Sequence, residues 1–463
     1  MIEKIQRHYF LSFVLLLTSS HVYSVAPNTV VATITTGVTP AGLAVTPNNH
    51  FAYVANNNNY GIAGEDTVSV LNLTDNLLEQ TITSTTFSEP YTVTINAAGT
   101  KAYVANSNAA TISIVDIATN TVTGLIGGFD GPSGMVITPD GTTAYVNNYG
   151  GPILGSGHGN TVRVVDLNTN TIVGPPIIVD LAPASLAIAP DGGLVYVITY
   201  SGGLPGTGLI NIIQTSNNTV VGTISGFSGP FAIAITPDGK YAYVTNFGSN
   251  NFAPIGTTVA VVDLTSNTII KMIDLAIQPS GIAITPDGRY AYVSNYNTLY
   301  SNGAPAFTGL TAGQGTVNII DIATNTVIPP IIPVGQSPDA IAISPNGHYA
   351  YVSNYTSNTV DVIALQSFQI TGQGCKTHNV FLLQRDLINK LTWSATGSSL
   401  PVSYSIYRDA ALTELVAIVP ATAPLQFLDH NRSPNVVYTY YVVGTNAVGT
   451  TSEPLAITVT QNC

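Results

Sequence analysis

The sequence predicts an all-β protein, and three observations point to this class. Charged residues make up 8% of the 463-residue chain, against about 25% in an ordinary soluble domain. The 42 glycines, 28 prolines and 24 tyrosines are typical of short strands separated by turns, because aromatic residues suit pleated surfaces and Gly and Pro interrupt them. The third observation is a unit of about 40 to 50 residues that recurs along most of the chain.

The first 24 residues have the pattern of a signal peptide. A stretch containing Lys4 and Arg7 precedes an apolar run from Phe10 to Leu17, and Val22-Tyr23-Ser24 offers a cleavage point. The run is shorter than the ~20 apolar residues that a membrane helix needs. We therefore expect an exported bacterial protein, periplasmic, at the cell surface or secreted, with no integral membrane segment after cleavage.

The net charge of the chain is −12. Nucleic acid favours proteins with a basic patch, because its phosphates are neutralised by Lys and Arg. The sequence therefore argues against a nucleic-acid partner.

One stretch, "GIAITPDGRYAYVSNYN" from Gly281 to Asn297, shows how the repeated unit begins. An apolar strand that follows a proline leads through a Pro-Asp-Gly turn into a second strand with a Tyr-Val pair. The tyrosine of this pair recurs seven times, at Tyr53, Tyr103, Tyr145, Tyr196, Tyr243, Tyr292 and Tyr351.

Two further strands complete each unit. A variable loop is followed by a third strand such as "TVAVVDL" from Thr258, and a fourth strand begins with Asn-Thr-Val or Asn-Thr-Ile. Four strands per unit is the pattern of a β-propeller blade. The seventh unit lacks its fourth strand, but "NTVVATI" from Asn28 to Ile34 matches "NTVVGTI" from Asn218 to Ile224 in all but one residue. The sequence thus predicts a seven-bladed β-propeller over residues 25–370, closed by the N-terminal strand.

The motifs "YAYVSN", "AYVTN" and "AYVAN" resemble the YVTN family of bacterial β-propeller repeats, which is related to surface-layer and quinoprotein-type propellers. Propellers of this kind include adhesive and surface-layer proteins, lactonases, lyases and cofactor-bearing dehydrogenases. The resemblance therefore implies the fold but does not select one activity.

Residues 371–463 lack the repeat and read as short alternating strands. They resemble a fibronectin type III domain, an immunoglobulin-like β-sandwich, with Trp393 at the place of its core tryptophan and "YTYYVVGTNAVG" from Tyr438 as a late strand and turn. The only two cysteines, Cys375 and Cys463, bracket this region. Because an exported protein can keep a disulfide, we expect these two residues to pair, the alternative being two free thiols.

The sequence offers little for metal or redox chemistry. It has no Cys-x-x-Cys-His motif, and His158 is the one histidine in a propeller loop that is not a turn of the repeat. We expect no metal and no cofactor. The recurring aspartates Asp116, Asp166, Asp263 and Asp321 precede tight turns, where Asp bonds to nearby backbone, so we interpret them as structural.

The candidate binding face is the one that carries the loops between the second and third strands, because only these loops vary in length and variable loops on a rigid scaffold commonly bind ligands. Several candidates lie at the starts of these loops or inside them: Tyr149, His158, Tyr200, Phe247, Tyr296, Tyr300, Phe307 and Tyr355. At the starts of inner strands, near the mouth of the channel on the same face, are Tyr91, Phe231 and Asp339. The aromatic rings could contact a ligand or pack between blades, and packing is the commoner role of strand aromatics.

Two functions remain open from the sequence. The sequence favours a non-catalytic binding, adhesion or cell-envelope protein that uses the loop-rich face to bind a protein, glycan or envelope component. The alternative is a lactonase- or lyase-type enzyme with a site at the mouth of the channel. Among long-loop residues only His158, Glu65 and Asp66 could serve such an enzyme, and they come from two blades.

Overall fold

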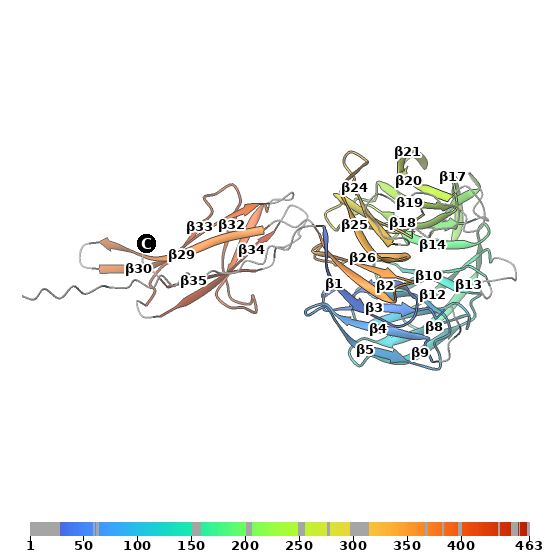
Figure 1. The fold of residues 1–463 in the computed structure, drawn as a ribbon, viewed down its shortest axis with the longest axis horizontal. Coiled ribbons are helices and arrows are strands. Elements are labelled where there is room, and N and C mark those ends of the chain that lie inside the picture. The colour runs from blue at the N-terminus through green and yellow to red at the C-terminus, as the bar shows by residue number, and fades with distance from the viewer. Residues whose placement is uncertain are drawn as a thin grey trace, which may run out of the picture.

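The structure, a computed structural model, describes residues 28–460 apart from 59–60, 62–63, 151–158, 201–205, 249–254, 276–277, 297–313, 366–368, 382–383, 397–400, 434–435, 446–451 and 453. Every regular element in these residues is a strand (Figure 1). Within the same residues no helix is long and apolar enough to cross a membrane. The all-β prediction is confirmed. The predicted signal peptide lies outside the described residues.

Seven four-stranded antiparallel sheets form the blades. The innermost strand of each blade is, in order, β2 (Pro40–Val45), β6 (Pro90–Ile95), β10 (Pro132–Ile137), β14 (Pro183–Ile188), β18 (Pro230–Ile235), β22 (Pro279–Ile284) and β26 (Pro338–Ile343). The second strands are β3 (Phe51–Asn56), β7 (Lys101–Asn106), β11 (Thr143–Asn148), β15 (Leu194–Thr199), β19 (Tyr241–Gly248), β23 (Tyr290–Asn295) and β27 (Tyr349–Asn354).

The outer half of each blade is built in the same way. The third strands are β4 (Thr67–Asn72), β8 (Thr111–Asp116), β12 (Thr161–Asp166), β16 (Gly208–Gln214), β20 (Ile255–Asp263), β24 (Gln314–Asp321) and β28 (Thr359–Ala364). The outermost strands are β5 (Leu77–Thr83), β9 (Thr121–Gly127), β13 (Thr171–Ile178), β17 (Thr219–Phe227), β21 (Thr268–Asp274), β25 (Thr326–Gln336) and, for the seventh blade, β1 (Thr29–Thr35).

The ring closes through the N-terminal strand, as the sequence predicts. Each innermost strand contacts the innermost strands of both neighbouring blades, including β2 against β26. Strand β1 pairs antiparallel with β28, so the seventh sheet has the order β1-β28-β27-β26. A buried carboxylate strengthens this junction, because Asp361 accepts hydrogen bonds from the Thr33 hydroxyl at 2.5 Å and the Gly335 backbone N–H at 2.8 Å. Closure within one blade leaves no unpaired seam between the first and last sheets.

The hydrophobic core lies between neighbouring blades. One cluster joins Tyr196 and Ile210 of the fourth blade to Ala242, Val244 and Val262 of the fifth. The motif tyrosines also connect blades through their hydroxyl groups, for example from Tyr145 to the Asn218 carbonyl oxygen at 2.5 Å. These contacts show that the Tyr-Val motif is part of the scaffold.

The short turns confirm the structural interpretation of the aspartates. Asp116 accepts hydrogen bonds from the backbone N–H and the hydroxyl of Thr119 at 2.9 and 2.8 Å. Asp263 accepts one from the Thr265 backbone N–H at 2.8 Å. These carboxylates hold their own turns through these hydrogen bonds.

The C-terminal region contains two further sheets. One has the order β29 (Gln369–Phe381), β30 (Gln384–Thr396), β33 (Gln426–Asp429), and the other the order β32 (Leu415–Pro420), β31 (Ser403–Tyr407), β34 (Tyr438–Thr445), β35 (Leu455–Val459). Trp393 is buried in the core that these strands share and meets Tyr404 edge to face at 5.5 Å. This arrangement supports the predicted sandwich. The fibronectin type III assignment stays a prediction, and so does the boundary at residue 371.

Candidate functional site

The loop-rich face is defined by connections between second and third strands and between successive blades. The turns that join first to second strands and third to fourth strands are short and lie on the opposite face. The long segments 151–158, 201–205, 249–254 and 297–313 all fall between a second and a third strand. His158, Tyr300 and Phe307 belong to these segments and lie outside the described residues.

A repeated backbone turn places one aromatic residue at the same point of five consecutive blades. The aromatic residue lies directly after the second strand or near its end. Its backbone N–H donates to the carbonyl oxygen of the residue just before the proline that begins the innermost strand of the same blade, at 2.9 to 3.0 Å. That acceptor residue has a positive φ in every case, such as 54° at Gln278 and 51° at Ser337. The aromatic residues placed in this way are Tyr149, Tyr200, Phe247, Tyr296 and Tyr355.

Some of these rings pack against one another across blades. Phe247 is buried, stacks on Phe231 with ring centroids 5.2 Å apart, and meets Tyr296 edge to face at 5.9 Å. The Tyr200 hydroxyl donates a hydrogen bond to the Gly248 carbonyl oxygen at 2.9 Å. Phe247 therefore serves packing, whereas the tyrosines keep part of their surface exposed.

Near the axis of the ring, Tyr91 lies within electrostatic reach of one carboxyl group and of three tyrosines from other blades. Burial raises the pKa of Tyr91 well above its ordinary value, and the charges of Asp339, Tyr149, Tyr355 and Tyr296 raise it further. These five residues come from the second, third, sixth and seventh blades. We call them the axial cluster.

Asp339 is the distinctive member of the axial cluster. Burial raises the pKa of its carboxyl group to about 7, because a desolvated site disfavours the charged form. Within the part of the chain that the structure describes, this carboxyl group has no hydrogen-bond or ion-pair partner. The Asp339 side chain is partly exposed, so a ligand can reach its carboxyl group.

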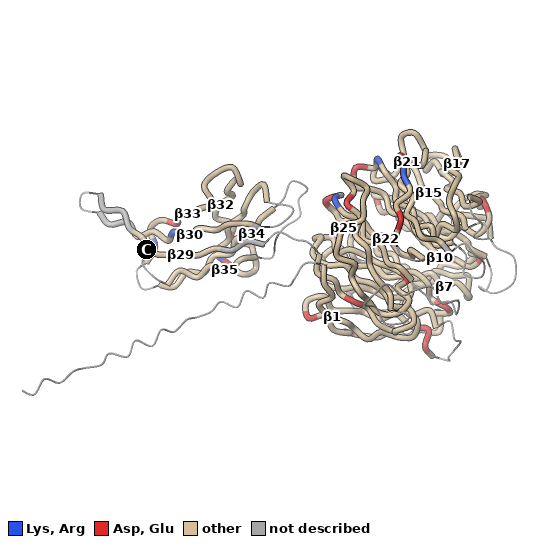
Figure 2. The backbone as a smooth tube through the Cα atoms, turned by 45° about the horizontal axis from the view of Figure 1, so that its top comes forward, with Lys and Arg blue, Asp and Glu red and all other residues tan. Residues whose placement is uncertain are grey.

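The axial cluster contains one acidic residue, Asp339. None of its five residues is basic, and Figure 2 shows that most of the propeller backbone belongs to uncharged residues. Sequence reasoning missed Glu89, which lies two residues before Tyr91 and whose backbone N–H donates to the Asp66 carboxylate at 2.9 Å. Burial raises the pKa of Glu89, and the neighbouring Asp66 raises it further. The sequence feature that could have identified Glu89 is its position directly before Pro90, which is equivalent to the position of Ser337 before Pro338.

The remaining predicted site is the disulfide. Cys375 lies on β29, and Cys463 lies outside the described residues. The pairing of the two cysteines stays a prediction. Among the described residues no three His, Cys, Asp or Glu side chains are grouped so as to hold a metal ion.

Comparison with known proteins identifies relatives of the propeller. A seven-bladed β-propeller protein of Mycobacterium tuberculosis, Rv1057, is 26% identical over 363 residues, which are 72% of this chain and 83% of that protein. A PE-PGRS family protein of the same organism, PE_PGRS18, is 44% identical over 59 residues, or 13% of each chain. The solved structure of Kuenenia stuttgartiensis hydrazine synthase aligns with a TM-score of 0.59 at 21% identity, covering 71% of this chain and 96% of that one, and shows the fold alone.

A family model described as lactonase, 7-bladed beta-propeller, matches residues 16–139 and 216–369. These segments make up more than half of the chain, and with the seven four-stranded sheets they establish that this chain belongs to the lactonase-type seven-bladed β-propeller family.

Proposed function

We propose that this chain is an exported, non-catalytic binding protein whose ligand site is the axial cluster and whose ligand is an uncharged sugar ring of a glycan. The observation that carries the proposal is that Tyr91 lies within electrostatic reach of three further tyrosines and of Asp339, a carboxyl group without a hydrogen-bond or ion-pair partner in the described chain.

The chemistry of the axial cluster suits a sugar. Tyrosine rings offer apolar faces to sugar C–H groups, and their hydroxyl groups exchange hydrogen bonds with sugar hydroxyls. Asp339 can donate a hydrogen bond when protonated and accept several when ionised. A phosphorylated or carboxylated ligand is disfavoured, because the five residues of the cluster include an acidic side chain and no basic residue that could neutralise an anion.

Titration calorimetry of the purified protein with neutral and uronic-acid oligosaccharides tests this proposal. We expect binding of the neutral series only. The variants Tyr355→Leu and Asp339→Asn should weaken it at least about tenfold, as for a central contact residue. Tyr241→Leu is a matched control, because Tyr241 begins β19 next to the opposite face. An unmodified protein that binds no neutral sugar, or a Tyr355→Leu variant that binds as tightly, would contradict the proposal.

One observation favours the enzyme as a second candidate. A carboxyl group with a pKa of about 7 is suited to general acid–base catalysis near neutral pH, and the family model is named for lactonases. Such an enzyme would add water to a lactone carbonyl and open the ring to a hydroxy acid. Acid release from uncharged lactones measures this activity. If the unmodified protein releases acid and the Asp339→Asn variant does not, the chain is an enzyme and the binding-only proposal is wrong.

We propose that the C-terminal region, with a Cys375–Cys463 disulfide, serves as a spacer or a second adhesive surface. Its two sheets and shared core support an independent folding unit. Mass spectrometry of peptides from the non-reduced protein would detect the crosslink, and free thiols at both positions would exclude it.

A further inference from the structure

Three aromatic residues of the fourth and fifth blades lie beside the axial cluster without belonging to it. They are Tyr200, Phe231 and Phe247, and we call them the aromatic patch. Tyr200 and Phe231 are partly exposed, whereas Phe247 is only 4% exposed. The exposed parts of the Tyr200 and Phe231 rings have no role in the axial cluster.

Phe247 is the fixed centre of the aromatic patch. Its backbone N–H donates to the Gly229 carbonyl oxygen at 3.0 Å, and the N–H of Gly248 donates to the Ser228 carbonyl oxygen at 3.1 Å. A side chain at position 229 would collide with the Gly248 carbonyl oxygen. The two backbone segments therefore approach as closely as a glycine permits, and Phe247 is held in place before any ligand binds.

Both partly exposed rings of the aromatic patch are attached to this centre. The Phe231 ring stacks on Phe247 with ring centroids 5.2 Å apart and an angle of 30° between the planes. The Tyr200 hydroxyl donates a hydrogen bond to the Gly248 carbonyl oxygen at 2.9 Å. The patch is therefore a preformed surface, which reduces the entropy that a ligand loses on ordering it.

The aromatic patch adjoins the axial cluster at two points. Phe247 meets Tyr296 edge to face, with ring centroids 5.9 Å apart. Burial raises the pKa of Tyr149, and the charge of Tyr200 raises it further, so these two tyrosines lie within electrostatic reach of each other. Tyr296 and Tyr149 belong to the axial cluster, so the two aromatic surfaces are contiguous.

The fold does not require a ring at position 231. Phe231 is the second residue of β18, which contacts the innermost strands β14 and β22 of the neighbouring blades. The same position is Ala184 in β14 and Ser280 in β22. Blades thus form with a small residue at this position, and the exposed part of the Phe231 ring is available to a ligand.

We propose that the aromatic patch is a second sugar subsite, and that the ligand is an oligosaccharide with two adjoining neutral rings, one at the axial cluster and one stacked on Phe231. This inference rests on the proposed function. The side chains of Phe231 and Phe247 have no polar atom, and the Tyr200 hydroxyl donates its proton to Gly248. The second subsite therefore contacts the apolar C–H face of its sugar ring and adds affinity mainly by stacking.

Calorimetric titration of the full chain with methyl glycosides of one and of two rings, in the glucose, mannose and galactose series, measures the second subsite. In a series that binds, we expect the two-ring glycoside to bind at least about fivefold more tightly than the one-ring glycoside. Equal affinities of the two glycosides would overturn the second subsite and leave the proposed function standing. No binding of any glycoside would contradict both.

Two variants assign the additional affinity to Phe231. Phe231→Leu removes the ring but keeps an apolar side chain, so it should reduce the affinity for the two-ring glycoside to that for the one-ring glycoside. Its unchanged binding of the one-ring glycoside shows that the variant is folded. Phe231→Tyr keeps a stacking ring and should retain the advantage of the two-ring glycoside.

Two further variants serve as controls. Tyr355→Leu alters the axial cluster and should weaken the binding of both glycosides by the same factor. Tyr241→Leu removes a ring from the fifth blade next to the opposite face and should change neither affinity. A Phe231→Leu protein that keeps the full advantage of the two-ring glycoside would refute the assignment.

Discussion

At the residue scale, the candidate chemistry lies in side chains that the repeat does not require. The second position of the seven innermost strands is Ala, Tyr, Ser, Ala, Phe, Ser and Asp in chain order, and Asp339 is its only acidic residue. The fold accepts small and large residues there, so the carboxyl group is not needed to form the blade. Its partly exposed position within electrostatic reach of Tyr91, together with its raised pKa, gives it the properties of a site residue.

Asp339→Asn should change how stability depends on pH. Burial raises the pKa of Asp339 from 3.8 to about 7, so the folded protein holds a proton that the unfolded chain releases. This stabilisation is complete below about pH 3.8, falls as the pH rises, and is lost once the pH passes about 7. Urea titrations between about pH 4 and 7 should show a steeper loss of unfolding free energy in the unmodified protein than in Asp339→Asn. Parallel curves would show that the carboxyl group is not buried.

At the element scale, the Tyr-Val strand connects each blade to the next. The Tyr145 hydroxyl donates to Asn218 at 2.5 Å and the Tyr292 hydroxyl to Asn28 at 2.7 Å. Their acceptors start the outermost strand of the following blade and have a positive φ of 57°. Asparagine tolerates that conformation better than most residues, which explains the Asn in the recurring Asn-Thr-Val.

Tyr145→Phe should lower the free energy of unfolding by about 1 kcal/mol, because it removes the part-buried hydrogen bond from the Tyr145 hydroxyl to Asn218. Tyr103→Phe is the matched control. Tyr103 holds the same motif position, but its hydroxyl makes no hydrogen bond within the described chain. Urea unfolding followed by far-UV circular dichroism compares the two. Equal losses would mean that the hydroxyl bond is not what stabilises the junction.

At the scale of the whole molecule, a seven-residue strand at one end of the propeller holds the other end in place. Strand β1 is hydrogen bonded to β28, more than 320 residues later in the chain. Ile34 of β1 is 4% exposed and packs in a cluster that contains residues of both the first and the seventh blades. The stability of the ring therefore depends on a contact that is very distant in sequence.

Ile34→Ala should destabilise the propeller by about 2 to 5 kcal/mol, the range for truncating a buried Ile. Val31→Ala should cost less than about 1 kcal/mol, because Val31 lies on the same strand but is 37% exposed. Thermal unfolding of both variants by calorimetry checks this difference. A similar melting temperature for the two would show that β1 is dispensable for closure.

The sequence by itself determined the propeller, the number of blades and the closing strand, because each blade repeats the same local pattern and the missing outer strand is present at the N-terminus. It also placed Tyr91, Tyr149, Tyr296, Tyr355 and Asp339 on one face, because strand ends alternate between faces in an antiparallel sheet.

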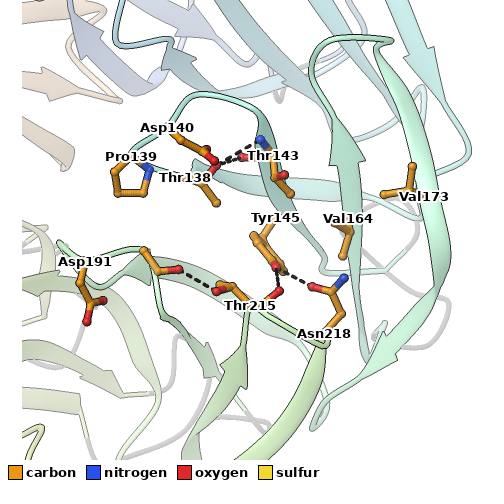
Figure 3. Close-up of a pocket in the computed structure, with 11 residues that line it drawn as sticks. Thr138, Pro139, Asp140, Thr143, Tyr145, Val164, Val173, Asp191, Thr215 and Asn218 are labelled. Atoms are coloured by element: carbon orange, nitrogen blue, oxygen red, sulfur yellow. Dashed lines mark hydrogen bonds between the residues drawn. The ribbon is translucent and has the colours of Figure 1, made fainter.

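Only the tertiary structure decided which of these residues meet. The axial cluster joins side chains up to 264 positions apart, and its electrostatics depend on burial that no single repeat contains. A cavity of about 450 Å³ between the third and fourth blades is lined by Thr143 and Asp191 (Figure 3), 48 positions apart, which face one junction only once the ring has formed. Desolvation and open volume are properties of packed neighbours, so they become visible only when the blades are assembled.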